Sequence, residues 1–320
     1  MKIKASIYVP ILLIVIFIFT GFYDSLLKIV VDISDNVYLS IAILQIFILL
    51  LPVAFYAKLR NLNFFQTIKF KYFKVRYIPF ILTVFSTSVL GMAILKYITF
   101  MFLGDESSSL AIPSGIYAEN DEFLILLCFV IIPAFLEEVV FRGFVLREYC
   151  EYGEPVALLV SSLAFAGLHF TFEGFITYFF AGLLLGLLAL VCESIVPSLI
   201  LHLTTNILNL YVQDSFIDYL KQMGSSVALI FILISVFLFF VYLLLTQLEY
   251  LLRRKGEEKT EENREAILIE ALKKEDKEEK NQDGNKENKK TSFSNRITEV
   301  LLSPTFLILI VIFTLRSAGT

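Results

Sequence analysis

Histidine occurs only twice in this sequence of 320 residues, and both histidines, His169 and His202, stand in strongly apolar stretches. Further polar groups share this setting: the adjacent carboxylates Glu137 and Glu138, and Asn206, which follows His202 by four residues. Carboxylates and imidazoles are the side chains that most often transfer protons in enzymes. Since an ionisable group inside an apolar membrane helix costs roughly 2.5–3.5 kcal/mol, these residues predict a polar reaction site within the bilayer.

The spacing of the charged residues separates the roles of the two carboxylates. Residues four apart lie on the same helix face, so Glu138 and Arg142 can form an ion pair that neutralises both. Glu137 differs from Glu138 by about 100° around the helix axis and has no such partner, which makes it the candidate acid or base. His202 and Asn206 are also four residues apart and are expected to point the same way.

Prolines precede two of these polar groups. Pro133 lies four residues before Glu137, and Pro197 lies five residues before His202. A proline removes an intrahelical hydrogen bond and can kink its helix, which would open room for water or a substrate backbone. The alternative is that membrane helices tolerate proline without such a role.

The chain as a whole has the composition of a membrane protein. Hydrophobic residues make up 57% and charged residues 18%, whereas soluble domains are about half apolar and a quarter charged. Runs that approach the roughly 20 apolar residues a span needs occur near 6–23, 38–57, 78–103, 123–147, 155–171, 174–192, 195–213 and 226–252, with a weaker ninth near 299–315. The expected fold class is an all-α polytopic membrane protein, a bundle of eight or nine transmembrane helices.

Basic residues in the connections predict how the helices are oriented. The connection at 58–78 carries six Lys or Arg residues and no acid, and Lys2 and Lys4 precede the first helix, whereas the connection after residue 103 is acidic. The N-terminus is therefore expected on the cytoplasmic side. The membrane is expected to be the plasma membrane. Because 58–78 also holds six aromatic residues, it could instead lie on the membrane surface and bind anionic headgroups.

The distribution of charge suggests how the chain is divided. We expect N-terminal membrane helices at 1–119, a core with the polar residues at 120–215, a further membrane helix at 216–252, a charged segment at 253–298 and a last helix at 299–320. The charged segment is rich in Glu, Lys and Asn and is expected to be a solvated helix or a disordered segment. No basic face interleaved with aromatic residues indicates a nucleic-acid partner.

Three motifs carry a resemblance to a known family. They are Glu-Glu-x-x-x-Arg at 137–142, Phe-x-x-x-His at 165–169 and His-x-x-x-Asn at 202–206, on successive expected helices. In this order and spacing, residues 120–215 resemble the CPBP family, which contains CAAX prenyl endopeptidases and the bacteriocin-processing or self-immunity proteins often labelled Abi. No motif position departs from the family pattern.

The resemblance implies an intramembrane endopeptidase that depends on a glutamate. Glu137 would activate water together with His169, while His202 and Asn206 would stabilise the oxyanion of the tetrahedral intermediate. The residues expected to support the site are Glu138 and Arg142, which hold its shape, and Phe165, which packs at i−4 beside His169 and orients its ring. The substrate would be a peptide or protein in contact with membrane lipid, either a CAAX-type protein tail or a leader peptide.

The family has also been described as metalloproteases, which leaves a second mechanism open. A divalent metal such as zinc would then be bound by Glu137, His169 and His202, with water in the open position. The His-Glu-x-x-His signature is absent, so these ligands would come from three helices. We prefer the metal-free mechanism, because its base and its oxyanion donors are all accounted for.

Two other classes of function fit parts of the pattern. Kinked helices with Glu, His and Arg near the middle of the membrane also describe an ion- or proton-coupled transporter. Both histidines are grouped with Asn206, whereas a transporter would spread its polar residues along a transport pathway, so this grouping argues against a transporter. A non-catalytic immunity or scaffold protein is the third alternative, and the intact motif set argues against that one.

Overall fold

The computed structural model describes residues 5–34, 36–103, 121–212, 227–275 and 293–318. Within these ranges every regular element is a helix, which confirms the all-α fold class. The predictions for Lys2 and Lys4, for the acidic connection at 104–120 and for part of the charged segment lie outside the described residues.

The chain forms a series of helices, some of which continue directly into the next. In chain order they are α1 (Ala5–Gly21), α2 (Tyr23–Ser34), α3 (Val37–Gln45), η1 (Ile46–Leu50), α4 (Leu51–Leu59), α5 (Phe64–Ile68), η2 (Val75–Tyr77), α6 (Ile78–Leu103), α7 (Glu122–Leu126), η4 (Leu127–Ile131), α8 (Ile132–Glu138), η5 (Val139–Val145), α9 (Leu146–Tyr149), η6 (Cys150–Tyr152), α10 (Glu154–Leu168), α11 (Phe172–Val191), α12 (Val196–Tyr211), α14 (Val227–Glu275), α15 (Phe293–Leu301) and α16 (Pro304–Ser317). Elements α7 to η6 follow one another without a break, and we call Glu122–Tyr152 the central rod.

Several of these helices are long and apolar enough to cross a membrane. Five meet this test within the described residues, at Val37–Leu59, Val75–Thr99, Glu122–Tyr152, Phe172–Val191 and Ile230–Glu258. Two bent pairs, α1 with α2 at 61° and α15 with α16 at 60°, raise the number to seven if each pair is one span, and α10 is a shorter apolar helix. The protein is therefore an integral membrane protein, and the count of eight or nine spans stays a prediction.

Helix α2 differs from the expected pattern, and α14 agrees with the solvated helix that was one of two alternatives for the charged segment. Helix α2 was not predicted, because Asp24, Lys28 and Asp32 interrupt its apolar residues and hide a span-like run. Helix α14 does not end where the charged segment begins but continues to Glu275. Glu, Lys and Arg are good helix formers, and the pairs Arg253–Glu249 and Arg254–Glu258 connect successive turns of the helix.

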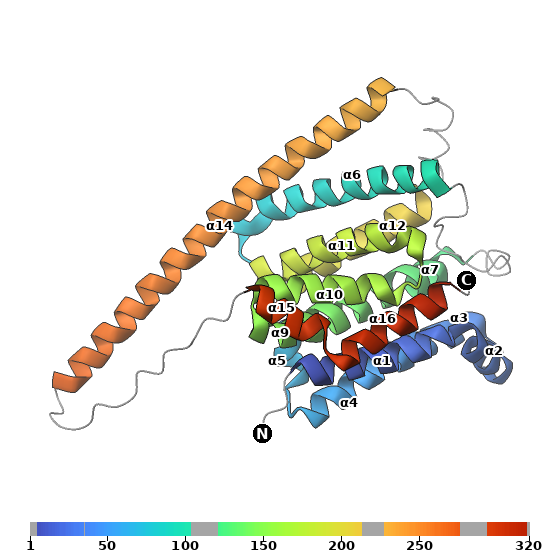
Figure 1. Ribbon diagram of the computed structural model, residues 1–320, viewed down its shortest axis with the longest axis horizontal. Helices are drawn as coiled ribbons and strands as arrows, with labels where there is room; N and C mark the ends of the chain where they lie inside the picture. Colours follow the sequence, from blue (N-terminus) through green and yellow to red (C-terminus); the bar gives the residue numbers. More distant parts are fainter. Residues whose placement is uncertain (1–4, 35, 104–120, 213–226, 276–292, 319–320) are drawn as a thin grey trace.

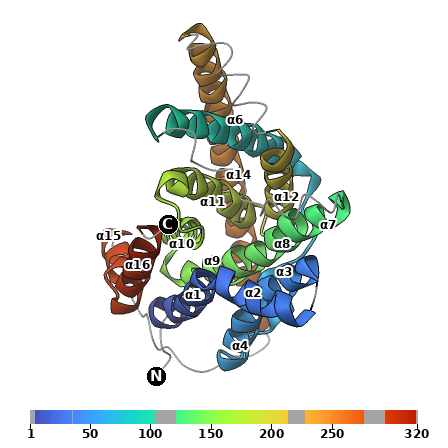
Figure 2. The ribbon, with the colours of Figure 1, turned by 90° about the vertical axis from the view of Figure 1, so that its right-hand side faces the viewer.

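The central rod and α10 lie in the middle of the bundle (Figure 2). Helices α1 to α4 cover one side of the rod, while α6, α11 and α12 cover the other. Helix α16 packs against α1, and α14 packs against α6 and extends far beyond the other helices (Figure 1). The rod is therefore shielded on both sides, and its polar residues face helices rather than lipid.

Close packing of α10 on α11 depends on two glycines of α11. A Cβ atom at Gly182 would lie 3.0 Å from the Cα of Ser162, and one at Gly186 would lie 2.6 Å from Leu158 Cδ1. At Gly182 the neighbour is backbone, which cannot give way as the end of the Leu158 side chain can at Gly186, so Gly182 sets the close approach, as small residues do between other membrane helices. This contact holds the end of α10, and hence the residues there, against the rod.

The two prolines behave differently. Pro197 lies in the first turn of α12, where the missing N–H is not needed, so the prediction of a kink before His202 was wrong. Pro133 lies within the rod, next to a turn in which the Ile132 N–H bonds to the Leu127 carbonyl, five residues back. The next bond of this kind would join Pro133 to the Cys128 carbonyl, but proline has no N–H to donate. The rod therefore carries one backbone acceptor that needs a partner from elsewhere.

Glu193, in the connection between α11 and α12, links this connection to α14. Its carboxylate lies 3.0 Å from Lys255 Nζ and 3.7 Å from Lys71 Nζ. The hydrogen bond from Lys255, with the nearby lysine charges, holds the pKa of Glu193 below its ordinary value. The ion pair thus stabilises the fold above the ordinary carboxyl pKa and is lost as the pH falls through the lower, folded value.

We expect Glu193→Gln to lower the free energy of unfolding by about 0.2–1 kcal/mol at pH 7, the range of solvent-exposed ion pairs. The difference from the wild type should shrink as the medium is acidified below the folded pKa of Glu193, because the wild-type carboxylate is then protonated as well. Thermal unfolding of both proteins in detergent at pH 7 and in acid measures it. A difference that grows in acid would contradict this assignment.

Candidate active site

A fully buried ion pair lies at the centre of the polar site. Arg142 Nη1 lies 2.9 Å from Glu138 Oε1, and both side chains are 0% exposed. The guanidinium also lies over the ring of Phe165, 4.4 Å from its centroid, and donates a hydrogen bond to the Gly182 carbonyl at 3.4 Å. The pair that the spacing of four residues predicts is therefore present, and α10 and α11 enclose it.

His202 of α12 joins the two carboxylates of the rod. Its Nδ1 lies 2.9 Å from Glu138 Oε1, and its Nε2 lies 3.7 Å from Glu137 Oε2. A carboxylate paired with Arg142 only accepts hydrogen bonds, so Nδ1 carries the hydrogen and donates it. This leaves Nε2 as the ring atom that faces Glu137. The sequence predicted only Arg142 as a partner of Glu138. The contact between Glu138 and His202 joins positions 64 apart, and no spacing along the chain indicates such a contact.

Glu137 and His169 line one cavity of about 150 Å³. Its other walls come from α1, α2, α3, η1, Pro133 of the rod and the last residue of α10. Glu137 Oε2 and His169 Nε2 are buried and have no hydrogen-bond partner in the described part of the chain. A buried polar atom left without a partner costs about 1–3 kcal/mol, and the cavity is well above the roughly 10–15 Å³ that one water needs. Glu137 and His169 thus line a cavity that is large enough to hold water.

The ring of His169 is held by two aromatic residues. His169 follows the last helical residue of α10, and its ring stacks on Tyr178 of α11 at 3.7 Å between centroids. Phe165 meets the ring edge-on at 5.2 Å, as its i−4 position predicts, and meets His202 in the same way at 5.7 Å. Tyr178 was not identified from the sequence, since no motif connects it to His169.

Asn206 lies one turn after His202 on α12 and is half-buried. Among the described residues no hydrogen bond joins it to Glu137, Glu138 or His169. For the metal alternative, no group of three His, Cys, Asp or Glu side chains in the described ranges could hold a metal ion. Glu137, His169 and His202 therefore do not form a ligand set in this arrangement.

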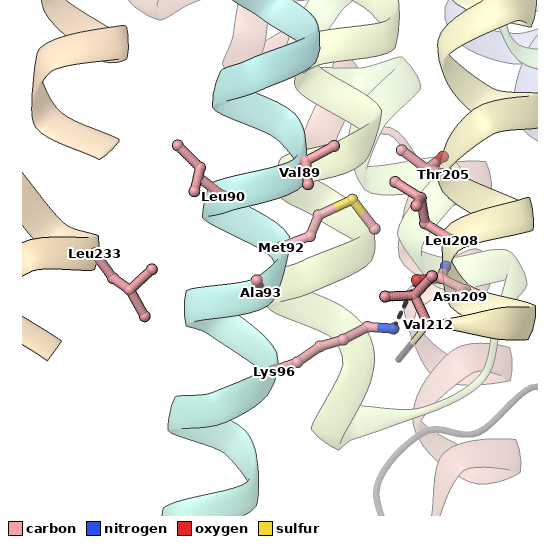
Figure 3. A pocket seen from close by; sticks show the side chains of 10 residues that line it. All are labelled: Val89, Leu90, Met92, Ala93, Lys96, Thr205, Leu208, Asn209, Val212 and Leu233. Carbon is pink, nitrogen blue, oxygen red and sulfur yellow. Dashed lines mark hydrogen bonds between the residues drawn. The ribbon is translucent and has the colours of Figure 1, made fainter. Parts of the chain in front are cut away.

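A second cavity of about 210 Å³ lies between α6 and α12 (Figure 3). It is mostly apolar, and at one end Lys96 donates a hydrogen bond to Asn209 Oδ1 at 3.0 Å. Lys96 is a charged residue inside a predicted membrane helix that sequence reasoning did not single out. It lies on α6 and lines a different cavity from Glu137 and His169.

The comparison with known families agrees with this geometry. Residues 119–208 match the family described as Type II CAAX prenyl endopeptidase Rce1-like. This range includes the central rod and every candidate residue from Glu137 to Asn206, which confirms the resemblance seen in the motifs. No curated protein and no solved structure matches the chain. The chain is therefore an integral membrane protein of which residues 119–208 are similar to this family.

Proposed function

We propose that the protein is a glutamate-dependent intramembrane endopeptidase that cleaves peptide bonds of membrane-associated substrates. The observation that supports this most directly is the cavity lined by Glu137 and His169, whose Oε2 and Nε2 atoms are buried and have no hydrogen-bond partner within the described residues. A polar cavity inside an apolar bundle is costly, and hydrolysis needs water at such a place. The substrate in this proposal is a CAAX-type protein tail or a leader peptide.

In the proposed reaction Glu137 is the general base. It takes a proton from the water in the cavity while the water oxygen attacks the scissile carbonyl carbon, and it then gives this proton to the leaving amine. His169 forms a hydrogen bond to the same water through Nε2 and fixes its position. The aromatic contacts of the ring with Tyr178 and Phe165 limit its rotation, so this water is held in one place before the reaction begins.

The tetrahedral intermediate carries a negative oxygen that needs donors. His202 is the first donor in this proposal and acts through Nε2, since its Nδ1 is already bound to Glu138; this role requires a hydrogen on both ring nitrogens. Asn206 is the second donor in this proposal and acts through its side-chain amide. One good donor to an oxyanion contributes about 2.7–4 kcal/mol to transition-state stabilisation. Glu138 and Arg142 position His202 and do not contact the substrate.

The metal-dependent alternative fits the described residues less well, because Glu137, His169 and His202 do not form a ligand set. We therefore propose the metal-free mechanism. We also propose that the protein lies in the plasma membrane with its N-terminus in the cytoplasm. Dialysis against a chelator is then expected to leave the cleavage rate unchanged, and metal-dependent recovery of a lost rate would favour the alternative.

His169→Ala is expected to abolish cleavage while the protein still inserts and folds. The assay uses protein in lipid nanodiscs and a prenylated CAAX peptide, with mass spectrometry of the products. Lys96→Met is the matched control, since it removes a polar group from a membrane helix outside the cavity, and it should cleave at the wild-type rate. Normal cleavage by His169→Ala would refute the proposal. Proton-dependent flux in vesicles without any peptide product would instead indicate a transporter.

A further inference from the structure

A glutamine from outside the matched domain shares the cavity with Glu137 and His169. Gln45 is the last residue of α3 and lines this cavity. Its Oε1 is buried and has no hydrogen-bond partner within the described ranges, as is true of Glu137 Oε2 and His169 Nε2. The three residues that carry these atoms thus come from different walls of the cavity: α3, α8 and the end of α10.

The orientation of the Gln45 amide follows from the backbone of the rod. The Cys128 carbonyl receives no hydrogen bond from Pro133, because proline has no N–H. Gln45 Nε2 donates to this carbonyl instead, at 2.9 Å. A carbonyl oxygen accepts only, so the NH₂ group of Gln45 must face it and the amide oxygen must face the other way. Gln45 therefore presents a hydrogen-bond acceptor, held in place by the rod that carries Glu137.

A hydrogen-bond acceptor in this position determines which groups the cavity can bind. In the proposed mechanism Glu137 is ionised before it takes a proton, and a carboxylate is also an acceptor, so the occupant of the cavity must bring hydrogen-bond donors. A peptide backbone offers one N–H for each residue, and inside a membrane every such group needs a partner from the protein. A glutamine oxygen is neutral and would pair with an N–H of any residue type.

We propose that Gln45 is a substrate-binding residue whose Oε1 accepts a hydrogen bond from one backbone N–H of the peptide next to the scissile bond. This inference rests on the proposed function and adds a binding residue to it. Thr20 and Tyr23, on either side of the bend between α1 and α2, line the same cavity. The helices that precede the matched domain thus complete the substrate site.

The test combines a change in the protein with a change in the peptide. Gln45→Met keeps the length of the side chain and removes its acceptor, and it is expected to lower kcat/KM for a prenylated CAAX peptide by about three- to tenfold. Peptides in which one backbone amide near the cleavage site is replaced by an ester lack one N–H each. For the ester that removes the bonded N–H, Gln45→Met should cause no further loss. Gln247→Met, which removes an amide from α14 where it contacts Thr83, is the matched control and should match the wild type on every peptide.

Each outcome decides the proposal. If Gln45→Met cleaves the amide peptide as well as the wild type does, or loses the same factor on every ester peptide, Gln45 does not bind a substrate N–H. A loss in kcat alone, equal for all peptides, would mean that it orients water instead and would equally overturn the proposal.

Binding separates this inference from the proposed function. The affinity of the amide peptide for Glu137→Gln protein is measured with and without Gln45→Met. If the wild type binds but does not cleave the peptide, the proposed function fails, while a three- to tenfold loss of affinity on Gln45→Met supports the binding role. If no protein binds the peptide, both proposals fall.

Discussion

Glu137→Gln is expected to lower kcat for peptide cleavage by about 10²- to 10⁴-fold, the usual contribution of a general base. The amide has the size of the carboxylate, so the cavity and the neighbouring His202 keep their positions, but it cannot take a proton from water. KM should change little, because Glu137 contacts the water in our mechanism and not the peptide backbone. Steady-state kinetics in nanodiscs with the prenylated CAAX peptide measure both constants.

A matched control separates this effect from a general loss of charge. Glu173→Gln makes the same change at the start of α11, on an exposed side chain, and should retain wild-type kinetics. Glu137→Gln should also unfold at or above the wild-type temperature, since it removes a buried carboxylate whose Oε2 has no hydrogen-bond partner in the described part of the chain. A kcat within tenfold of the wild type would rule out Glu137 as the base.

Arg142→Met is expected to lower the free energy of unfolding by about 3–5 kcal/mol, the effect of breaking a buried ion pair from one side. The substitution leaves the Glu138 carboxylate, which is 0% exposed, without its charged partner. It also removes the cation from the face of Phe165, a contact worth about 0.5–2 kcal/mol. The free energies of unfolding of the variant and the wild type are measured in detergent, with the loss of the helical circular dichroism signal as the readout.

The double variant Glu138→Gln with Arg142→Met tests the cause of this loss. It removes both charges, and a buried pair replaced by neutral groups is often close to neutral in stability, so the double variant should recover most of the lost stability. It should nevertheless cleave slowly, because His202 Nδ1 would no longer donate to a carboxylate. A double variant as unstable as the single one would show that the ion pair is not the source of the effect.

The site therefore combines a rigid half and an open half. Glu138 Oε1, Arg142 and the Nδ1 edge of His202 are joined by contacts of 2.9 Å, although Glu138 Oε2 and Arg142 Nε are buried without hydrogen-bond partners in the described part of the chain. On the other side Gln45, Glu137 and His169 leave partners unfilled around the cavity. Fixed polar groups next to an open polar cavity are what a preorganised hydrolytic site requires, and the rod contributes Glu138 to the first and Glu137 to the second.

Much of this arrangement follows from the sequence itself. The apolar runs predicted the helices closely, and the run at 78–103 coincides with α6, because a lipid-facing helix must be apolar along its whole length. The Glu138–Arg142 pair follows from a spacing of four residues on one helix. The scarcity of ionisable groups in these runs identified His169, His202 and the two glutamates, because each such group is costly there.

Tertiary structure decided which of these groups meet. The contact of His202 with Glu138 joins positions 64 apart, and that of Gln45 with Cys128 joins positions 83 apart. Spacing along a helix predicts neighbours only within a turn or two, so neither contact has a local signal. The run predicted at 195–213 already placed Pro197 near the start of its helix, and α12 begins at Val196, where a proline does not kink the helix. The residues of the site are thus determined by the chemistry of the sequence, and their partners by how the helices pack.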